Sequence, residues 1–215
     1  VVLTCHARCE TQAIVDALGL KMRDLFDDQT PSKANGTRRR AEIVATYDYT
    51  DEHENRLFQV VRLSPKTFRQ RHHNPSNSQA KNDGWVWNLQ GVRRVLYRLP
   101  AVLAACAAGG RVWIVEGEKD VHALEAAGEV ATCNPMGAGK WNDAYADSLH
   151  GASEVIVIAD RDTAGCRHAL EILASLEPRS IPARVVWPAV TADKADAADH
   201  LAAGHTIDQF VDVDR

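Results

Sequence analysis

The stretch Trp113–Leu124, WIVEGEKDVHAL, decides the fold because its character changes halfway along. It begins with the apolar run of a buried strand and continues with a spacing typical of a helix. Charged residues crowd the junction between the two, namely Glu116, Glu118, Lys119 and Asp120. A solvated, acid-rich helix start would explain them. So would a ligand site at the carboxyl end of a parallel strand, where open α/β sheets place their sites.

A second stretch, EVIVIADRDTAGCRHALEIL at residues 154–173, repeats this pattern. Asp160 and Asp162 follow its apolar run, and because they are two residues apart they point to the same side of an extended chain. If this strand neighbours the one at 111–115, Glu116 and the aspartate pair converge on one cleft. Hard carboxylate oxygens without His or Cys are the ligands that Mg²⁺ or Mn²⁺ prefers. The alternative is that both aspartates only cap the following helix.

From residue 111 onward strands and helices alternate, which predicts a parallel sheet buried on both faces. The expected strands are 111–115, 130–133, 154–159 and 183–187, and the expected helices are 119–127, 142–150, 163–175 and 197–203. Upstream, residues 41–64 favour a β-hairpin that turns at Asp51–Asn55. Residues 65–84 indicate a basic, turn-rich loop, and residues 85–110 indicate two short strands and a helix. The predicted fold class is α/β, preceded by a basic α+β subdomain.

Composition agrees with an ordinary globular protein, since 45% of the 215 residues are hydrophobic and 25% are charged. The net charge of −4 is divided unequally. Residues 1–108 hold 16 of the 25 Lys and Arg and 11 of the 29 Asp and Glu, whereas residues 109–215 hold the acidic excess. A basic half beside an acidic half suggests a polyanion-binding face next to a cation-binding one. Five scattered cysteines and no apolar run near the roughly 20 residues of a membrane span favour a reducing cytoplasm.

The basic half supplies candidates for contacts to nucleic-acid phosphates, which give affinity independent of sequence. These candidates are Lys66, Arg69, Arg71, Arg93 and Arg94. The first three are the strongest, because a flexible basic loop has little structural purpose. The last two are adjacent, so only one of them can face a cleft from a strand.

Two further lysines are candidates for nucleotide phosphates. Lys119 at its helix start either meets a phosphate or pairs with Glu116. Lys140 lies in NPMGAGKW, residues 134–141, which lacks the spacing of a P-loop. A Gly-rich turn that opens a helix still offers backbone N–H groups to phosphate. The alternative is that the glycines only allow a tight connection between a strand and a helix.

A glutamate after one strand and Asp-x-Asp after a later one, in a small α/β unit, resemble the Toprim domain. VEGEKDV and IADRDTAG are most similar to the DnaG-type primases of phages and mobile elements, and NPMGAGKW and DAADHLAAGHT occur in the same order there. This resemblance implies that Glu116, Asp160 and Asp162 are catalytic and bind metal, with Asp120 as a further metal ligand. Asp196 and Asp199 resemble a third acidic element near the end of the domain, but their spacing departs from the DnaG pattern.

The resemblance extends upstream, where CHARCETQAIVDALGL is similar to the second half of a zinc ribbon. It implies three parts: a ribbon remnant with a helix at 1–30, a basic α+β subdomain of the primase core at 31–108, and the Toprim domain at 109–215. Cys5, His6 and Cys9 are fewer than the four ligands of a structural zinc site. We therefore expect no stable zinc in this chain.

The function implied by the resemblance is template-directed synthesis of short RNA primers from NTPs on single-stranded DNA. In this reaction a 3′-hydroxyl attacks an α-phosphate, and one to three Mg²⁺ or Mn²⁺ ions are the expected cofactor, with Glu116 as candidate general base. Expected partners are the template, NTPs and a replicative helicase of the full-length protein, with no membrane, in a bacterial or phage-infected cytoplasm. A Toprim nuclease with similar acids and a non-catalytic single-stranded-DNA-binding module are the alternatives.

Overall fold

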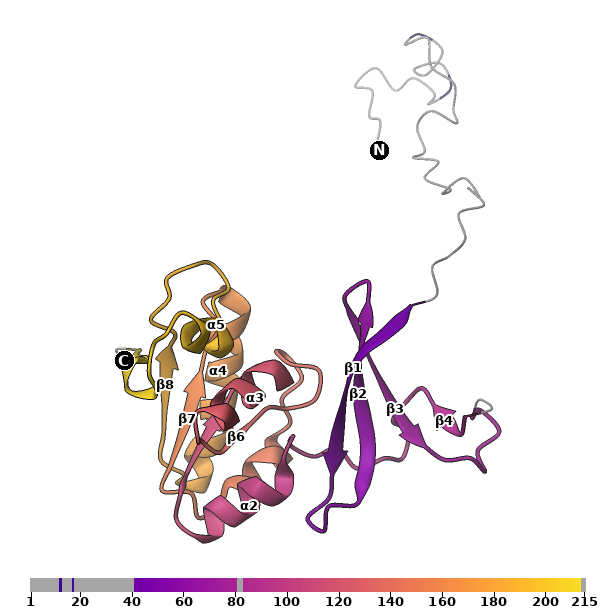
Figure 1. Ribbon diagram of the computed structural model, residues 1–215, viewed down its shortest axis with the longest axis horizontal. Coiled ribbons are helices and arrows are strands. Elements are labelled where there is room, and N and C mark those ends of the chain that lie inside the picture. The colour runs from indigo at the N-terminus through magenta and orange to yellow at the C-terminus, as the bar shows by residue number, and fades with distance from the viewer. Residues whose placement is uncertain (1–11, 13–16, 18–40, 81–82, 214–215) are drawn as a thin grey trace. The chain divides into compact units, whose positions relative to one another are not determined.

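The computed structural model describes residues 12, 17, 41–80 and 83–213 (Figure 1). The chain divides into two compact units, residues 1–40 and 41–215, and the fold below is that of the second unit. The predicted zinc-ribbon ligands Cys5, His6 and Cys9 lie outside the described residues.

The second unit begins with an antiparallel sheet of four strands in the order β1-β2-β3-β4 (Figure 1). Its strands are β1 (Glu42–Thr50), β2 (Arg56–Ser64), β3 (Thr67–His73) and β4 (Trp85–Val86). The β1–β2 hairpin forms where the alternation predicted it. Asp51 closes its turn, because the Asp51 carboxylate accepts hydrogen bonds from the backbone N–H groups of His53 and Asn55, both at 2.9 Å.

The prediction of a loop at residues 65–84 is wrong, because this segment contains β3, which pairs with β2. Both faces of β3 carry polar residues, so its sequence lacks the apolar alternation by which a strand is recognised. Pairing buries part of this polarity. Arg71 donates from Nε to Gln59 Oε1 at 2.8 Å, and its guanidinium lies 3.9 Å from the ring centroid of Trp85.

A second sheet follows, with strand order β6-β5-β7-β8-β9. Its strands are β5 (Arg111–Ile114), β6 (Ala131–Thr132), β7 (Glu154–Ile158), β8 (Ala183–Trp187) and β9 (Val211–Asp212). The first four are parallel, as predicted, and the short edge strand β9 adds an unpredicted antiparallel pair with β8. β5 and β7 are neighbours, which is the condition for bringing Glu116 and Asp160 together.

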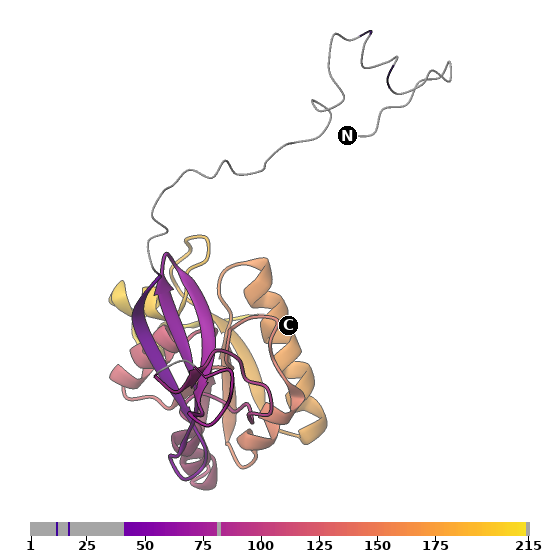
Figure 2. The same ribbon diagram turned by 90° about the vertical axis from the view of Figure 1, so that its right-hand side faces the viewer.

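Both faces of the second sheet are covered, which explains the unbroken apolar runs of β5 and β7. Val112, Ile114, Val155 and Val157 pack in one cluster with residues of α2 (Leu99–Ala107) and α4 (Thr163–Leu176). Trp113, Val115, Ile156 and Ile158 pack in the other with residues of α3 (Glu118–Ala126), α5 (Ala197–Ala202) and the first sheet. Figure 2 gives a second view of these layers. In the part of the chain that the structure describes, no helix is long and apolar enough to cross a bilayer.

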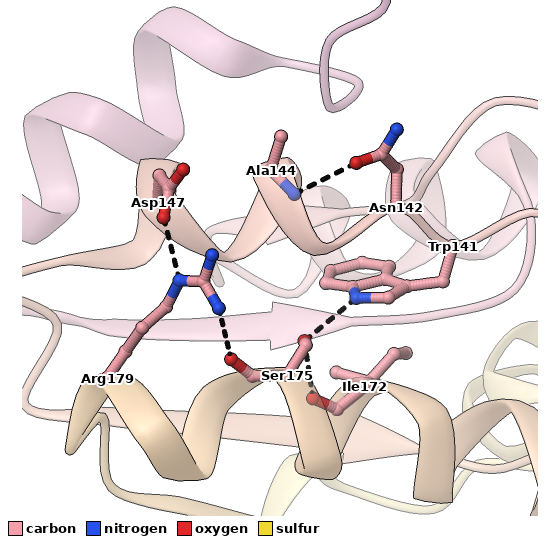
Figure 3. Close-up of polar contacts among 7 residues, drawn as sticks. All are labelled: Trp141, Asn142, Ala144, Asp147, Ile172, Ser175 and Arg179. Carbon is pink, nitrogen blue, oxygen red and sulfur yellow. Dashed lines mark hydrogen bonds and ion pairs between the residues drawn. The ribbon is translucent and has the colours of Figure 1, made fainter.

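The helix predicted at 142–150 is the 3₁₀ helix η2 (Asp143–Leu149). It is held against α4 and the short 3₁₀ turn η3 (Glu177–Arg179) that follows it (Figure 3). Trp141 Nε1 donates to Ser175 Oγ at 2.8 Å, and Arg179 Nε donates to Asp147 Oδ1 at 2.7 Å. These contacts anchor the end of the Gly-rich segment. Of the two short strands predicted in 85–110, only β4 forms.

Candidate active site

A cleft of about 380 Å³ opens between the first sheet and the carboxyl ends of β5 and β7. Its lining combines acids, bases and a few apolar groups. The acids are Glu116, Glu118, Asp120, Asp160 and Asp196, the bases are Arg62, Lys66 and Lys119, and the larger apolar side chains are Tyr47, Val60, Phe68 and Met136. We call Glu116, Asp120, Asp160 and Asp196 the acidic cluster, and Arg62 with Lys66 the basic pair.

The acidic cluster follows from strand order and helix starts. β5 and β7 run parallel in register, with Ile114 opposite Val157, so the residues after them emerge side by side. Glu116 and Asp160 therefore lie close enough for the charge of Glu116 to raise the pKa of Asp160. Gly117 caps α3 in extended conformation, which places Asp120 in the first turn of the helix, where a carboxylate interacts favourably with the helix dipole.

Burial and crowding hold protons in the acidic cluster. Burial, followed by the charges of Glu116 and Asp120, raises the pKa of Asp160 to about 8. Burial, followed by the charge of Asp196, raises the pKa of Asp120 to about 7. A carboxyl group that is buried beside other carboxylates keeps its proton to a higher pH, because like charges close together in a poorly solvated site repel each other. Carboxyl groups with such perturbed pKa values are typical of functional sites.

Asp162 has a different surrounding from Asp160. Its Oδ1 accepts a hydrogen bond from the backbone N–H of Gly165 at 2.8 Å, so it is the N-cap of α4. Gly165 packs tightly here, because a Cβ at this position would lie 2.5 Å from the Asp160 carbonyl oxygen. Asp162 therefore acts as a helix cap in this structure, as one of the two predicted alternatives stated. The role of Asp162 in metal binding stays a prediction.

Lys119 pairs with Asp196, not with Glu116. Its Nζ lies 2.7 Å from Asp196 Oδ2. Partial burial is the largest single influence and lowers the pKa of Lys119, but the hydrogen bond to Asp196 together with the charges of Asp120, Asp196 and Asp199 raises the net pKa. Asp196 is also the N-cap of α5, where its Oδ1 accepts from the backbone N–H of Asp199 at 2.8 Å. Asp196 thus both lines the cleft and caps α5, whereas Asp199 takes part in the cap and is not among the residues that line the cleft.

The first sheet contributes the basic pair through strand alternation. Arg62 and Phe68 are directly opposite on β2 and β3, so they share one face, and both line the cleft. Lys66 reaches the same cleft from the turn between these strands. On β3, Arg69 and Arg71 lie one and three positions after Phe68, so their side chains lie on the face of the sheet opposite to Phe68. The predicted basic group is therefore split, and only Lys66 of its three members lines the cleft.

Sequence reasoning missed Arg62. Its signal was available in the period of β2, because Arg62 lies two residues beyond the buried Val60 and so faces the same side. The remaining predicted cations are not among the cleft-lining residues. Arg93 forms an exposed ion pair with Glu52 at 2.8 Å, and Arg94 and Lys140 are exposed. Their contacts to nucleic acid or nucleotide stay predictions.

The Gly-rich segment after β6 supports Glu116. Gly137 has a φ of 69°, and a Cβ on it would lie 3.4 Å from Glu116 Cγ, so only glycine combines this conformation with this approach. Asn134 Nδ2 donates to the Gly137 carbonyl at 2.8 Å and braces the turn. The segment thus has a defined structural purpose, and its binding of phosphate stays a prediction.

The donor chemistry of the acidic cluster suits a hard divalent cation. Its oxygens are carboxylate oxygens only, and a cation would relieve the repulsion that now keeps protons on Asp160 and Asp120. Within residues 41–80 and 83–213, no three Asp, Glu, His or Cys side chains are already arranged to hold a metal ion. Three of the nearby carboxylates instead accept hydrogen bonds from backbone N–H groups: Asp120 from Ala198, Asp162 from Gly165 and Asp196 from Asp199.

Comparison with known proteins identifies the parallel strands of the second sheet and the helices between them. Residues 111–186 match the model of the Toprim domain, and this part of the chain is a Toprim domain. No curated protein matches the chain. The similar solved structures include the primase fragment of the bacteriophage T7 primase-helicase protein, with a TM-score of 0.53 and 22% identity over 74% of this chain. The E. coli primase catalytic core is similar with a TM-score of 0.54 and 19% identity over 78% of this chain.

A DnaG primase catalytic domain solved with bound single-stranded DNA is also similar, with a TM-score of 0.53 and 18% identity over 78% of this chain. The match covers 57%, 52% and 53% of the three solved chains, so this chain spans about half of their length. At these identities the likeness establishes the fold, an antiparallel sheet followed by a mostly parallel Toprim sheet. The predicted fold class is thereby confirmed.

Proposed function

We propose that this chain is the catalytic core of a primase, which synthesises short RNA primers from NTPs on a single-stranded DNA template. The observation that carries the proposal is the arrangement of the cleft, in which the acidic cluster of the Toprim domain lies opposite the basic pair of the first sheet. Metal ions need the carboxylates, the triphosphate needs the cations, and one cleft contains both.

The acidic cluster would hold the metal. Glu116 and Asp160 are the proposed ligands, Asp120 lies beside them, and Asp162 joins them after releasing the cap of α4. Divalent ions at such a site stabilise the charge on the attacking and leaving oxygens of a phosphoryl group. The exchange of bound protons for metal ions would make metal affinity rise with pH through the pKa of about 8 of Asp160.

The side chains of this cleft have separate proposed roles. Glu116 accepts the proton of the 3′-hydroxyl as its oxygen forms a bond to the α-phosphorus, and the bond from that phosphorus to the bridging oxygen breaks to release pyrophosphate. Lys66 and Arg62 attract the triphosphate, and Lys119 contacts it once its pair with Asp196 is exchanged. Phe68, partly exposed beside them, offers a ring on which a base can stack.

The proposed template contacts lie on exposed cations outside the cleft lining, Arg69 and Arg94 among them. Arg71 is 9% exposed and donates a hydrogen bond to Gln59, so its proposed role is to stabilise β3 and not to contact the template. The expected signature of such contacts is a steep loss of DNA affinity with salt. Charge reversal of Arg69 should flatten that salt dependence, whereas reversal of Lys66 should mainly raise the KM for NTPs.

The deciding experiment incubates the protein with single-stranded DNA, labelled NTPs and Mg²⁺ or Mn²⁺ and scores synthesis against cleavage. Asp160→Asn combined with Asp162→Asn should abolish synthesis while the circular dichroism spectrum is retained. Asp208→Asn, which removes an exposed carboxylate of η4 (Ile207–Gln209) that does not line the cleft, should leave synthesis unchanged. Cleavage in place of synthesis would indicate a Toprim nuclease, and DNA binding with neither reaction would indicate a binding module.

A further inference from the structure

A buried hydrogen bond joins the first sheet to the Toprim domain at the edge of the cleft, which Glu118 helps to line. Tyr49 of β1 donates from its hydroxyl to Glu118 Oε1 at 2.8 Å. Tyr49 is 0% exposed and Glu118 is 7% exposed. The two residues are 69 positions apart in the sequence, so the bond exists only through tertiary structure.

A carboxyl group in this position is costly unless it is bound. Glu118 is the first residue of α3, so the helix N-terminus favours its charge, and the Tyr49 hydroxyl is the side-chain donor to it. A well-packed apolar side chain of similar volume would often stabilise a protein more than a buried polar interaction. The hydrogen bond therefore favours a defined geometry over maximal stability.

Tyr49 and Glu118 are each connected to residues that line the cleft. Glu118 lies between Glu116 and Asp120, which belong to the acidic cluster. The Tyr49 ring stacks on Phe58 of β2, with 4.6 Å between centroids, and Phe58 lies on the same strand and face as Arg62. The bond thus links the helix that carries part of the acidic cluster to the strand that carries part of the basic pair.

A small tilt of β2 at the contact between Tyr49 and Phe58 would move Arg62 farther than it moves Phe58. Phe58 and Arg62 are four positions apart, which is roughly 13 Å of extended chain. A tilt of about 5° at the Tyr49 contact would therefore move Arg62 by about 1 Å. A displacement of that size is enough to reduce a reaction that depends on positioning by about 100-fold.

We propose that Tyr49 and Glu118 are a positioning pair that sets the distance between the basic pair and the acidic cluster. The proposal rests on the proposed function, because it assigns the pair to a cleft that binds triphosphate with metal. The acidic cluster alone binds the divalent cation, so that step does not depend on the pair. A metal–triphosphate complex must contact both sides of the cleft and does depend on it.

The test measures binding by calorimetry with two probes, Mn²⁺ alone and inorganic triphosphate in saturating Mn²⁺. Tyr49→Phe keeps the ring and removes only the hydroxyl. It should leave Mn²⁺ affinity within about twofold of wild type and weaken triphosphate binding about tenfold, because Arg62 is then no longer held at the required distance from the acidic cluster. Glu118→Gln keeps an oxygen that accepts from Tyr49 and should lose less triphosphate affinity than Glu118→Leu.

Tyr97→Phe is the matched control. Tyr97 is 3% exposed in the same core, and its hydroxyl lies 2.9 Å from Nε2 of His122, farther along α3 and outside the cleft. This variant should lose a comparable amount of thermal stability and keep wild-type triphosphate affinity. An equal loss of triphosphate affinity in Tyr97→Phe and Tyr49→Phe would assign the effect to general stability and overturn the proposal.

The outcomes separate this proposal from the proposed function. Normal triphosphate binding by Tyr49→Phe, in a protein whose wild type makes primers, overturns the positioning pair alone. Reduced binding by Tyr49→Phe, in a protein whose wild type makes no primers, supports the pair and overturns only primer synthesis. A wild type that binds Mn²⁺ but no triphosphate overturns both.

Discussion

Replacing Asp160 by asparagine should stabilise the metal-free protein, although it removes a proposed catalytic group. The folded protein raises the pKa of Asp160 from an ordinary value of 3.8 to about 8, with burial as the main cause and the charge of Glu116 next. The folded chain therefore binds this proton more tightly than the unfolded chain. Stability must fall as pH rises from about 4 toward 8, and the cost is complete above pH 8.

The size of the effect follows from this shift. About four pKa units correspond to an upper limit of about 6 kcal/mol at pH 8. The cleft is open to water, which screens these charges, so we expect asparagine to recover about 1–3 kcal/mol. For a folded unit of this size that gain raises Tm by about 3–8 °C.

Thermal unfolding in EDTA at several pH values between 5 and 8 measures this gain, with Asp208→Asn as the control for loss of an exposed carboxylate. The gain of Asp160→Asn should grow with pH and be small at pH 5. Millimolar Mn²⁺ should then raise the Tm of wild type and not that of the variant, because only a bound ligand stabilises the folded state. A variant that is less stable than wild type at pH 8 in EDTA, or a gain that is equal at all pH values, would refute this reasoning.

Three further predictions concern the surroundings of the site. Asp162→Ala should cost about 1 kcal/mol of stability through loss of the α4 cap, whereas Asp162→Asn should keep the cap; urea unfolding distinguishes the two. Burial lowers the pKa of His168, which is 4% exposed with no hydrogen bond at either ring nitrogen and with Nδ1 3.9 Å from Glu171 Oε2, so the contribution of His168 to stability should fall as pH drops below about 6.5, opposite in sign to that of Asp160. His168→Leu should therefore gain Tm relative to wild type between pH 7 and pH 5, and an unchanged difference in Tm between the two proteins would contradict this. Trp141→Phe and Ser175→Ala should each cost about 1 kcal/mol, and the double variant should cost less than their sum because both remove one hydrogen bond.

The alternating strands and helices after residue 111 were predictable because their signals are local. A buried parallel strand is an apolar run, and a helix has its own spacing, so neither requires knowledge of distant residues. Once the sheet is parallel, its carboxyl ends lie at one edge, so acids placed after β5 and β7 meet there if the two strands are neighbours. The α/β alternation could therefore be derived from the residues and the Toprim fold was implied by resemblance, whereas the adjacency of β5 and β7 that brings Glu116 to Asp160 came from the structure.

Tertiary structure decided the features that depend on register and on distant partners. β3 forms because β2 is available to pair with it, and this pairing sends Lys66 to the cleft and Arg69 to the opposite face. The partner of Lys119 is Asp196, 77 residues away, and no spacing in the sequence specifies such a contact. The same is true of Tyr49 and Glu118, because a hydrogen bond across 69 residues depends on how two sheets pack. Local sequence thus determined which groups stand at the strand ends, and long-range packing determined which of them face one another.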